Sequence, residues 1–180
     1  MRPPFIALCG YPKCGKSTVQ NILSEFGFIP VDDGRVLRDI GKMMFGLGED
    51  QVSTQEGKAG YVDLFGKQWQ VRDILGTLGN ILERTFGEYA VPAATIRNAC
   101  SPSLSYSFGS VRKNQGLYYK SLGGIVIQID RKGCHSDYDF DQWNKEAVDF
   151  VIDNNGSFEV IRSQIDAISR KLTLGNAVAA

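Results

Sequence analysis

Residues 10–18 read Gly-Tyr-Pro-Lys-Cys-Gly-Lys-Ser-Thr, which contains the pattern G-x-x-x-x-G-K-S. In such a pattern Gly10 and Gly15 let the backbone curl, so that successive N–H groups point inward and surround anionic oxygens. Lys16 reaches the β- and γ-phosphates of a nucleotide, and the Ser17 hydroxyl binds Mg²⁺. The stretch therefore predicts a loop that binds the phosphates of a nucleoside triphosphate.

The residues on either side of the loop have the periodicities of a strand and of a helix. Residues 5–9 are an apolar run that suits a buried strand, and apolar residues recur at helical spacing over 19–26. The helix adds the positive end of its dipole to the phosphate site. A strand, a glycine-rich loop and a helix in this order are the context that the motif requires. We therefore expect the donor nucleotide to contact Gly10, Lys13, Cys14, Gly15, Lys16, Ser17 and Thr18.

The rest of the chain alternates between strand and helix patterns. Further strands are predicted at 28–31, 106–108, 125–129 and 148–152, and further helices at 35–45, 71–85 and 158–172. Strands separated by helices indicate a parallel sheet covered on both faces, with ligands at the carboxyl ends of the strands. The sequence predicts an α/β protein, the three-layer P-loop NTPase fold with a five-stranded parallel sheet. Two polar, glycine-containing segments are interpreted as a mobile acceptor-side loop (48–70) and a lid (131–141).

Length and composition limit the number of domains, the classes of partner and the cellular compartment. A chain of 180 residues suits a single domain, 1–180. Its 20 basic and 20 acidic residues give no overall field that would attract a nucleic-acid polymer or an anionic membrane, and no apolar run approaches membrane-spanning length. The four cysteines form no C-x-x-C pair, which favours a reduced, cytoplasmic protein. We expect no signal peptide before the first strand, and a homodimer is compatible with this composition.

Two familiar classes of phosphate-loop protein fit poorly. Residues 130–133 match the D-x-x-G of GTPases, but 144–147 lack the closing Asp of N-K-x-D, whose carboxylate would read guanine. The two segments also lie only eleven residues apart, from 133 to 144. An ATPase motor would need a longer chain and an acidic pair after an apolar strand. Neither class is favoured.

Further motifs follow the loop in order. They are Leu37-Arg38, Phe45-Gly46-Leu47 with Asp50-Gln51, Arg72 with Leu75 and Gly79, Val111-Arg112 with Asn114, Arg131, and Asn154-Asn155-Gly156-Ser157. This ordered set, which spans nearly the whole chain, resembles the tailed-phage deoxynucleoside monophosphate kinases. That family has a Leu-Lys helix running into F-G-L, then R-x-x-L-Q-x-x-G-T, D-V-R-x-x-N-E, a lid arginine and N-x-G before the last helix.

The resemblance implies an ATP- and Mg²⁺-dependent enzyme that phosphorylates a (deoxy)nucleoside monophosphate to the diphosphate. It implies that Arg38 and Arg72 hold the acceptor phosphate and that Arg112 and Arg131 supply positive charge from the lid side. Asn154 and Gly156 would lie in a loop that contacts adenine. A phage-encoded protein of this kind would work in the host cytoplasm on small nucleotides.

The chain departs from the family pattern at several positions. Ser110 stands where the family has a strand-end Asp that holds Mg²⁺ through water, and Gly76, Asn80 and Gln115 replace Gln, Thr and Glu. Asp32 and Asp33 follow the predicted second strand, where Asp33 could take over the metal role. An Asx turn that caps the next helix is an equal interpretation of these two residues.

Charge and protonation support a phosphate acceptor independently. A nucleoside monophosphate is largely dianionic near neutral pH and needs no general base, and the sequence offers arginines but no obvious base. Two alternatives remain open. One is another small-molecule kinase, similar to dephospho-coenzyme A kinase, in which Asp32 or Asp33 would be the base for a hydroxyl. The other is a nucleotide-binding protein without activity.

Overall fold

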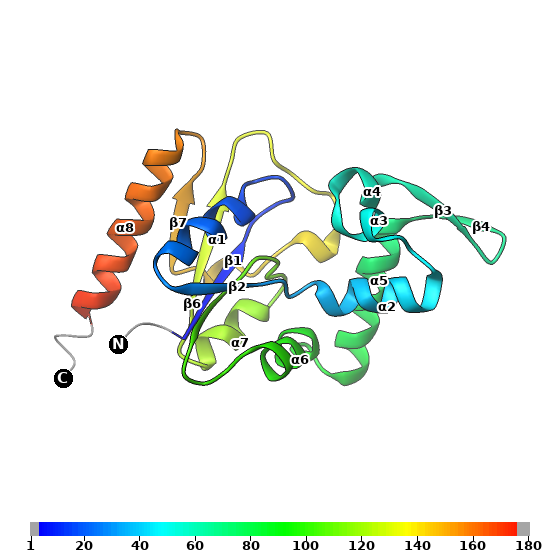
Figure 1. The fold of residues 1–180 in the computed structure, drawn as a ribbon, viewed down its shortest axis with the longest axis horizontal. Coiled ribbons are helices and arrows are strands. Elements are labelled where there is room, and N and C mark those ends of the chain that lie inside the picture. The colour runs from blue at the N-terminus through cyan, green and yellow to red at the C-terminus, as the bar shows by residue number, and fades with distance from the viewer. Residues whose placement is uncertain (1–3, 176–180) are drawn as a thin grey trace. The chain divides into compact units, whose positions relative to one another are not determined.

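The computed structural model describes residues 4–175, with side chains to residue 172 (Figure 1). The strands are β1 (Phe5–Cys9), β2 (Phe28–Val31), β3 (Tyr61–Leu64), β4 (Lys67–Gln70), β5 (Ser105–Phe108), β6 (Ile125–Asp130) and β7 (Phe150–Asp153). The helices are α1 (Lys16–Glu25), α2 (Arg35–Phe45), α3 (Glu49–Ser53), α4 (Gln55–Ala59), α5 (Val71–Phe86), α6 (Ala90–Ala99), α7 (Gln115–Ser121) and α8 (Phe158–Gly175), with 3₁₀ turns η1 (Asp139–Asp141) and η2 (Lys145–Ala147).

The chain divides into two compact units, which are described separately. The sheet unit comprises the residues up to Asp33 and those from Ile96 onwards, and the helix–hairpin unit comprises Gly34–Thr95. The single domain expected from the chain length stays a prediction. None of the helices within residues 4–175 is long and apolar enough to cross a membrane.

The sheet unit contains a five-stranded parallel sheet in the order β2-β5-β1-β6-β7. After β1 the chain moves to the β2 edge, returns through β5, and then crosses to β6 and β7 on the other side of β1. The direction of strand addition therefore reverses at β1. In open α/β sheets this is the point where ligands bind, beyond the carboxyl ends of the strands.

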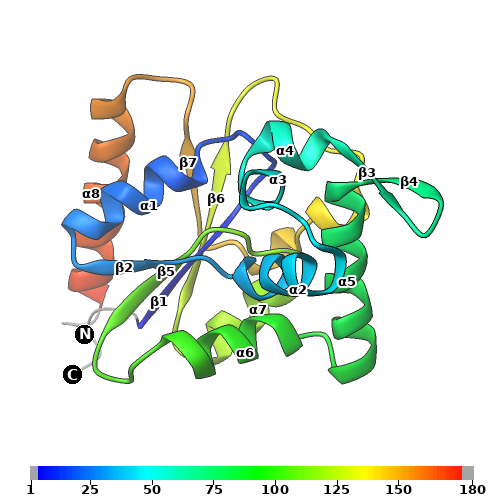
Figure 2. The same cartoon turned by 45° about the vertical axis from the view of Figure 1, so that its right-hand side comes forward.

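Alternation along the central strands places a helical layer on each face of the sheet. Ile6 and Leu8 of β1 belong to the cluster formed with α1 and α8, which lie side by side (Figure 2), and Ala7 and Cys9 belong to the cluster that includes Tyr119 of α7. Side chains on a strand alternate between faces, so a strand covered on both sides reads as a continuous apolar run. The predicted α/β class, with a five-stranded parallel sheet and helices on both faces, is confirmed.

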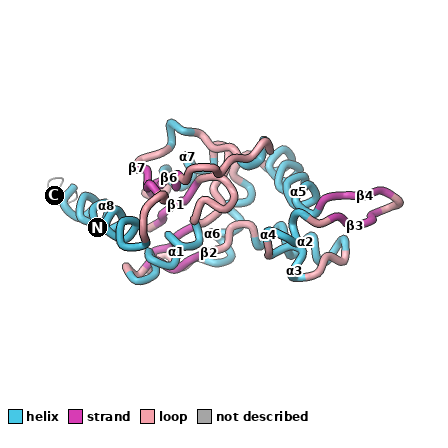
Figure 3. The backbone as a smooth tube through the Cα atoms, turned by 90° about the horizontal axis from the view of Figure 1, so that it is seen from above, coloured by secondary structure: helices cyan, strands magenta, loops and turns pink. Residues whose placement is uncertain are grey.

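The prediction of an irregular loop at 48–70 is wrong as to secondary structure. The segment forms α3, α4 and the antiparallel hairpin β3–β4, which leads directly into α5 and projects outward from it (Figure 3). The hairpin turns through Phe65 and Gly66, both with positive φ, as a two-residue turn requires. Phe-Gly lacks the usual Asn-Gly signal, and for this reason the sequence did not reveal the turn. Its mobility stays a prediction.

Two further helices, α6 and α7, were not predicted from the sequence. Helix α7 has only seven residues, too few to show a periodicity, and Gly116 near its start packs closely against Val126 and Ala147. Helix α6 contains Pro92, which the first turn of a helix tolerates because its N–H would have no partner there. The other predicted elements are present, with ends shifted by a few residues at most.

Two buried tyrosines give a matched test of packing. The Tyr119 hydroxyl has no hydrogen-bond partner in the described part of the chain, whereas the Tyr106 hydroxyl accepts a hydrogen bond from the Ser101 amide at 2.6 Å. We expect Tyr119→Phe to leave the free energy of unfolding unchanged or to raise it, and Tyr106→Phe to lower it by about 1 kcal/mol. Urea denaturation of both variants measures the difference. A larger loss for Tyr119→Phe than for Tyr106→Phe would contradict the expectation.

Candidate functional site

The phosphate loop connects the carboxyl end of β1 to α1 and has the backbone conformation that its sequence implies. Gly10, Lys13 and Gly15 have φ angles of 140°, 66° and 101°. A side chain on Gly10 would lie 2.6 Å from the Ile129 carbonyl oxygen, so the β6 backbone leaves no room for one. The first intrahelical bond of α1 runs from the Val19 amide to the Gly15 carbonyl oxygen at 3.1 Å. The N–H groups that precede this bond lie at the positive end of the helix dipole, which is suited to bind an anion.

Lys16, the first residue of α1, turns its side chain back onto the loop. Its Nζ donates to the Gly10 carbonyl at 2.6 Å and to the Tyr11 carbonyl at 2.8 Å. Ser17 and Thr18, in the same first turn, are exposed. The ammonium is thus held at the mouth of the loop, where the motif places the β- and γ-phosphates.

The cysteines near the loop are poor nucleophiles. Burial raises the pKa of the Cys14 thiol, and it raises that of Cys9 to about 12 despite the nearby Lys16. A thiol needs its thiolate form to react. Cys14 therefore contributes through its backbone, and its carbonyl oxygen accepts a hydrogen bond from Asn154 Nδ2 at 2.6 Å.

Asp33 and Ser110 meet at the carboxyl ends of β2 and β5. Val31 of β2 pairs with Phe108 of β5, and Asp33 and Ser110 each lie two residues beyond that pair. The Ser110 amide donates to Asp33 Oδ2 at 3.2 Å, whereas Oδ1 is buried without a hydrogen-bond partner among the described residues. The Asx-turn interpretation is therefore wrong for Asp33. Its carboxylate instead lies beside Ser110 at the end of β5.

The environment of Asp33 favours its protonated form. Burial raises the pKa of this carboxyl from 3.8 to about 6, and the charge of Arg112 and the hydrogen bond from Ser110 oppose the shift. Desolvation disfavours a carboxylate, and a nearby cation stabilises it. The group consequently titrates close to neutral pH, beside a guanidinium.

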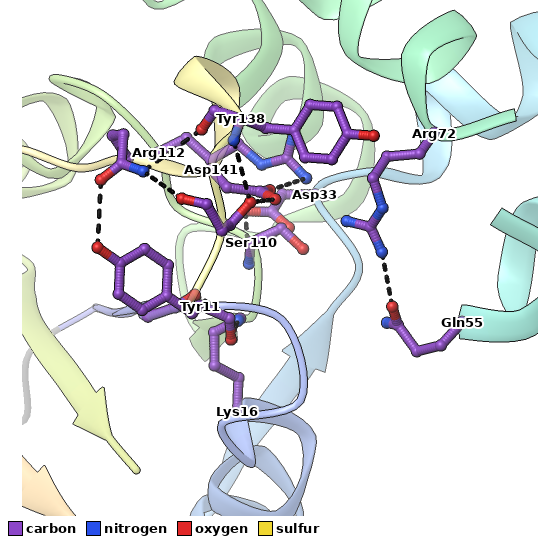
Figure 4. A network of polar contacts seen from close by, with 12 residues as sticks. Tyr11, Lys16, Asp33, Gln55, Arg72, Ser110, Arg112, Tyr138 and Asp141 are labelled. Carbon is purple, nitrogen blue, oxygen red and sulfur yellow. Dashed lines mark hydrogen bonds and ion pairs between the residues drawn. The ribbon is translucent and has the colours of Figure 1, made fainter. Parts of the chain in front are cut away.

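Arg112 is the guanidinium that the structure places near Asp33 (Figure 4). Its NH2 lies 3.6 Å from Oδ1 of the buried Asp141, and its Cζ lies 5.4 Å from the centroid of the Phe140 ring. Asp141 Oδ2 also accepts a hydrogen bond from Ser136 Oγ at 2.7 Å. The arginine is predicted from the sequence, but Asp141, its partner, is not, because 29 residues separate the two (141 − 112) and no local pattern connects them.

The predicted lid segment 131–141 is anchored by the residues that follow it. The Lys113 amide donates to the Gln142 carbonyl at 2.6 Å, and the Asn144 amide donates to the Lys113 carbonyl at 2.7 Å. Tyr11 of the phosphate loop donates from its hydroxyl to Gln142 Oε1 at 3.4 Å, and its ring meets that of Trp143 edge-on at 4.9 Å. These contacts join residues far apart in the chain, so no local sequence pattern predicts them.

The first half of the same segment is more open. Arg131, Lys132 and His135 are exposed after β6, and the Lys132 amide donates to Asn155 Oδ1 at 2.8 Å. Gly156, two residues after Asn154, is exposed as well. Closure of a lid over nucleotides, a role for Arg131 and adenine contacts from Asn154 or Gly156 stay predictions.

The other two predicted arginines belong to the helix–hairpin unit. Arg38 is half-buried on α2, and Arg72, the second residue of α5, donates from NH2 to Gln55 Oε1 at 2.7 Å. The acceptor role predicted for both arginines stays a prediction.

The donor set fits a magnesium ion held mainly by nucleotide and water. Within residues 4–175, no group of three or more His, Cys, Asp or Glu residues could hold a metal. Mg²⁺ commonly keeps several waters and takes one or two protein ligands plus phosphate oxygens. The exposed Ser17 hydroxyl and the Asp33 carboxyl, whose Oδ1 has no partner among residues 4–175, supply oxygens of the required kind.

Comparisons with known proteins find similarity in structure only. No family model matches the chain, and no curated protein matches it. Among solved structures, dephospho-CoA kinase from Campylobacter jejuni is similar with a TM-score of 0.46 and 15% identity, over 94% of this chain and 97% of that one. Shikimate kinase from Aquifex aeolicus has a TM-score of 0.44 and 15% identity, over 98% and 99%. Shikimate kinase from Acinetobacter baumannii in complex with shikimate also has a TM-score of 0.44 and 15% identity, over 97% of this chain and 94% of that one. Similarities this distant carry no conclusion about function.

The shifted pKa of Asp33 predicts a pH-dependent stability. Because the folded-state pKa of about 6 lies above the ordinary 3.8, the unfolded chain loses this proton first, and stability falls as pH rises through about 6. We expect Asp33→Asn to raise the free energy of unfolding by about 2–3 kcal/mol at pH 8 and by little at pH 4. Urea denaturation at both pH values measures this, with the exposed Asp32→Asn as control. An equal effect of Asp33→Asn at the two pH values would contradict the burial of this charge.

Proposed function

We propose that this protein transfers the γ-phosphoryl group of ATP, bound with Mg²⁺, to a small-molecule acceptor. The observation that carries the proposal is the phosphate loop at the reversal point of the parallel sheet, with Lys16 held at its mouth. Asp33, Ser110 and Arg112 follow strands of the same sheet at their carboxyl ends, where α/β proteins bind ligands.

The acceptor that we favour is a nucleoside monophosphate. In the reaction, the bond between the γ-phosphorus and the β–γ bridging oxygen breaks, and an acceptor phosphate oxygen forms the new bond, which leaves ADP and a nucleoside diphosphate. An acceptor dianion needs no base, so the protein must supply positive charge and alignment. The support for this acceptor is the ordered set of motifs, with Arg38 and Arg72 for the acceptor phosphate and Arg112 and Arg131 for the transferring group.

The phosphate loop, Lys16, Ser17 and Asp33 each have a definite role in this proposal. The amides of the phosphate loop and Lys16 stabilise charge that develops on the donor phosphates, because they are oriented before the reaction begins. Ser17 and Asp33 are the residues that would hold Mg²⁺, Ser17 through its hydroxyl and Asp33 through water. The metal, when bound, neutralises charge on the β- and γ-phosphate oxygens.

One observation favours a second candidate, a kinase for a hydroxyl acceptor. A hydroxyl loses its proton as it attacks, and a carboxylate with a pKa near the working pH is suited to accept that proton. Asp33 has a pKa raised to about 6 and one buried oxygen without a partner among the described residues. In this candidate the same carboxylate serves as the base.

An ADP-release assay over nucleoside and deoxynucleoside monophosphates tests the proposal. We expect turnover with at least one of them, and a loss of roughly a hundred- to thousand-fold in kcat for Lys16→Ala, because one preorganised donor is removed. Lys171→Ala, which removes an exposed lysine side chain on α8 away from the phosphate loop, controls for the loss of charge. ATP binding without ADP release for any acceptor would identify a nucleotide-binding protein without activity, and near-normal turnover by Lys16→Ala would overturn the role of the loop.

Asp33→Asn separates the two acceptor classes. With a hydroxyl acceptor, loss of the base predicts a drop in kcat of roughly a hundred-fold or more and loss of the ionisation near pH 6 from the pH–rate profile. With a monophosphate acceptor, we expect a smaller loss that excess Mg²⁺ partly restores. Assaying the variant with the best acceptor of each class shows which pattern holds. Full activity of Asp33→Asn with every acceptor would exclude both roles.

A further inference from the structure

Asn154 and Asn155 join three segments of the sheet unit just beyond the end of β7. The Asn154 amide donates to the Asp130 carbonyl at 2.7 Å, at the end of β6. The Asn154 side chain donates from Nδ2 to the Cys14 carbonyl in the phosphate loop at 2.6 Å, and Asn155 Oδ1 accepts from the Lys132 amide at 2.8 Å. The phosphate loop is therefore tied to the far end of the chain, 140 residues away.

The contact between Asn154 and the loop is close as well as polar. A Cβ atom on Gly15 would overlap Nδ2 of Asn154. Gly15 also has a φ of 101°, a conformation that other residues rarely adopt. Gly15, the second glycine of the motif, is thus required both for its backbone conformation and for the close approach of the Asn154 side-chain amide.

The hydrogen bond from Asn154 to the Cys14 carbonyl also affects the orientation of the Gly15 N–H. The Cys14 carbonyl and the Gly15 N–H belong to one planar trans peptide, so they point in opposite directions. A phosphate loop needs its N–H groups directed inward, which leaves carbonyls that require donors elsewhere. By holding the Cys14 carbonyl, Asn154 restrains this peptide from rotating and so fixes the direction of the Gly15 N–H.

We propose that Asn154 is a positioning residue for the phosphate loop, and that it affects the bound triphosphate through the Cys14–Gly15 peptide instead of through contact with the base. This inference rests on the donor site of the proposed function and deepens it. It predicts that loss of Asn154 weakens the binding of any polyphosphate by a similar factor, whether or not a nucleoside is attached.

Binding of inorganic tripolyphosphate, which has no base, tests the inference. Isothermal titration calorimetry with Mg²⁺ compares tripolyphosphate and ATP on the wild type, Asn154→Ala and Asn155→Ala. We expect Asn154→Ala to weaken both ligands by a similar factor, roughly three- to tenfold, the effect of one lost hydrogen bond. Asn155→Ala alters the same turn without touching the Cys14 carbonyl, and we expect its affinity for tripolyphosphate to remain that of the wild type.

The opposite pattern overturns the inference. If Asn154→Ala binds tripolyphosphate as the wild type does, the residue does not position the loop, and a selective loss of ATP affinity would identify a base contact. Asn154→Asp has nearly the same volume but cannot donate to the carbonyl, so it serves if the alanine variant fails to fold; we expect its tripolyphosphate affinity to fall as well. A wild-type protein that binds neither ligand would instead overturn the proposed donor site, and this inference with it.

Discussion

The backbone of the phosphate loop requires hydrogen-bond donors for its carbonyl groups, and Lys16 and Asn154 of the sheet unit supply them. A loop that directs its N–H groups toward an anion leaves carbonyl groups that need donors of their own. Lys16 donates to the Gly10 and Tyr11 carbonyls, and Asn154 donates to the Cys14 carbonyl. Without these donors the loop would lose the hydrogen bonds that hold its peptides in an anion-binding orientation.

Lys16 and Asn154 differ in whether a bound phosphate competes with the loop carbonyls for their hydrogen bonds. Lys16 is cationic and its ammonium donates to the Gly10 and Tyr11 carbonyls, so a phosphate can compete with these carbonyls for it. Asn154 is neutral, and its backbone N–H is bonded to the end of β6. Its side chain can therefore hold the Cys14 carbonyl whether or not a ligand is present. The loop thus combines a charge that is able to follow the phosphates with a fixed support on its outer side.

A second group of residues, Arg112 with two carboxyl groups, influences the protonation of Asp33. Arg112 lies between two carboxyl groups, Asp33 and Asp141, of which Asp141 is the ion-pair partner and Asp33 is the group with the raised pKa. Burial of a carboxylate without full hydrogen bonding costs stability, and proteins retain such groups mainly where they act on a ligand. Asp33 Oδ1, which has no hydrogen-bond partner among the described residues, therefore makes this carboxyl a candidate for chemistry outside the phosphate loop.

The sequence alone determined the parts of this protein that depend on neighbouring residues. The strand, loop and helix around residues 10–18 were predictable because each has a short-range signature, and so was the α/β class. Short elements were not, because seven residues in α7 show no period and the Phe65-Gly66 turn lacks a standard signal.

Tertiary structure alone decided how distant residues combine. The register of β2 on β5 brings Asp33 to Ser110, and no property of either residue in the sequence shows that pairing. The same holds for Arg112 with Asp141 and for Asn154 with Cys14. Spacing along the chain reports local backbone geometry, whereas the protonation of a buried carboxyl and the support of a loop depend on which strands and helix ends pack together. That packing is set by the whole core.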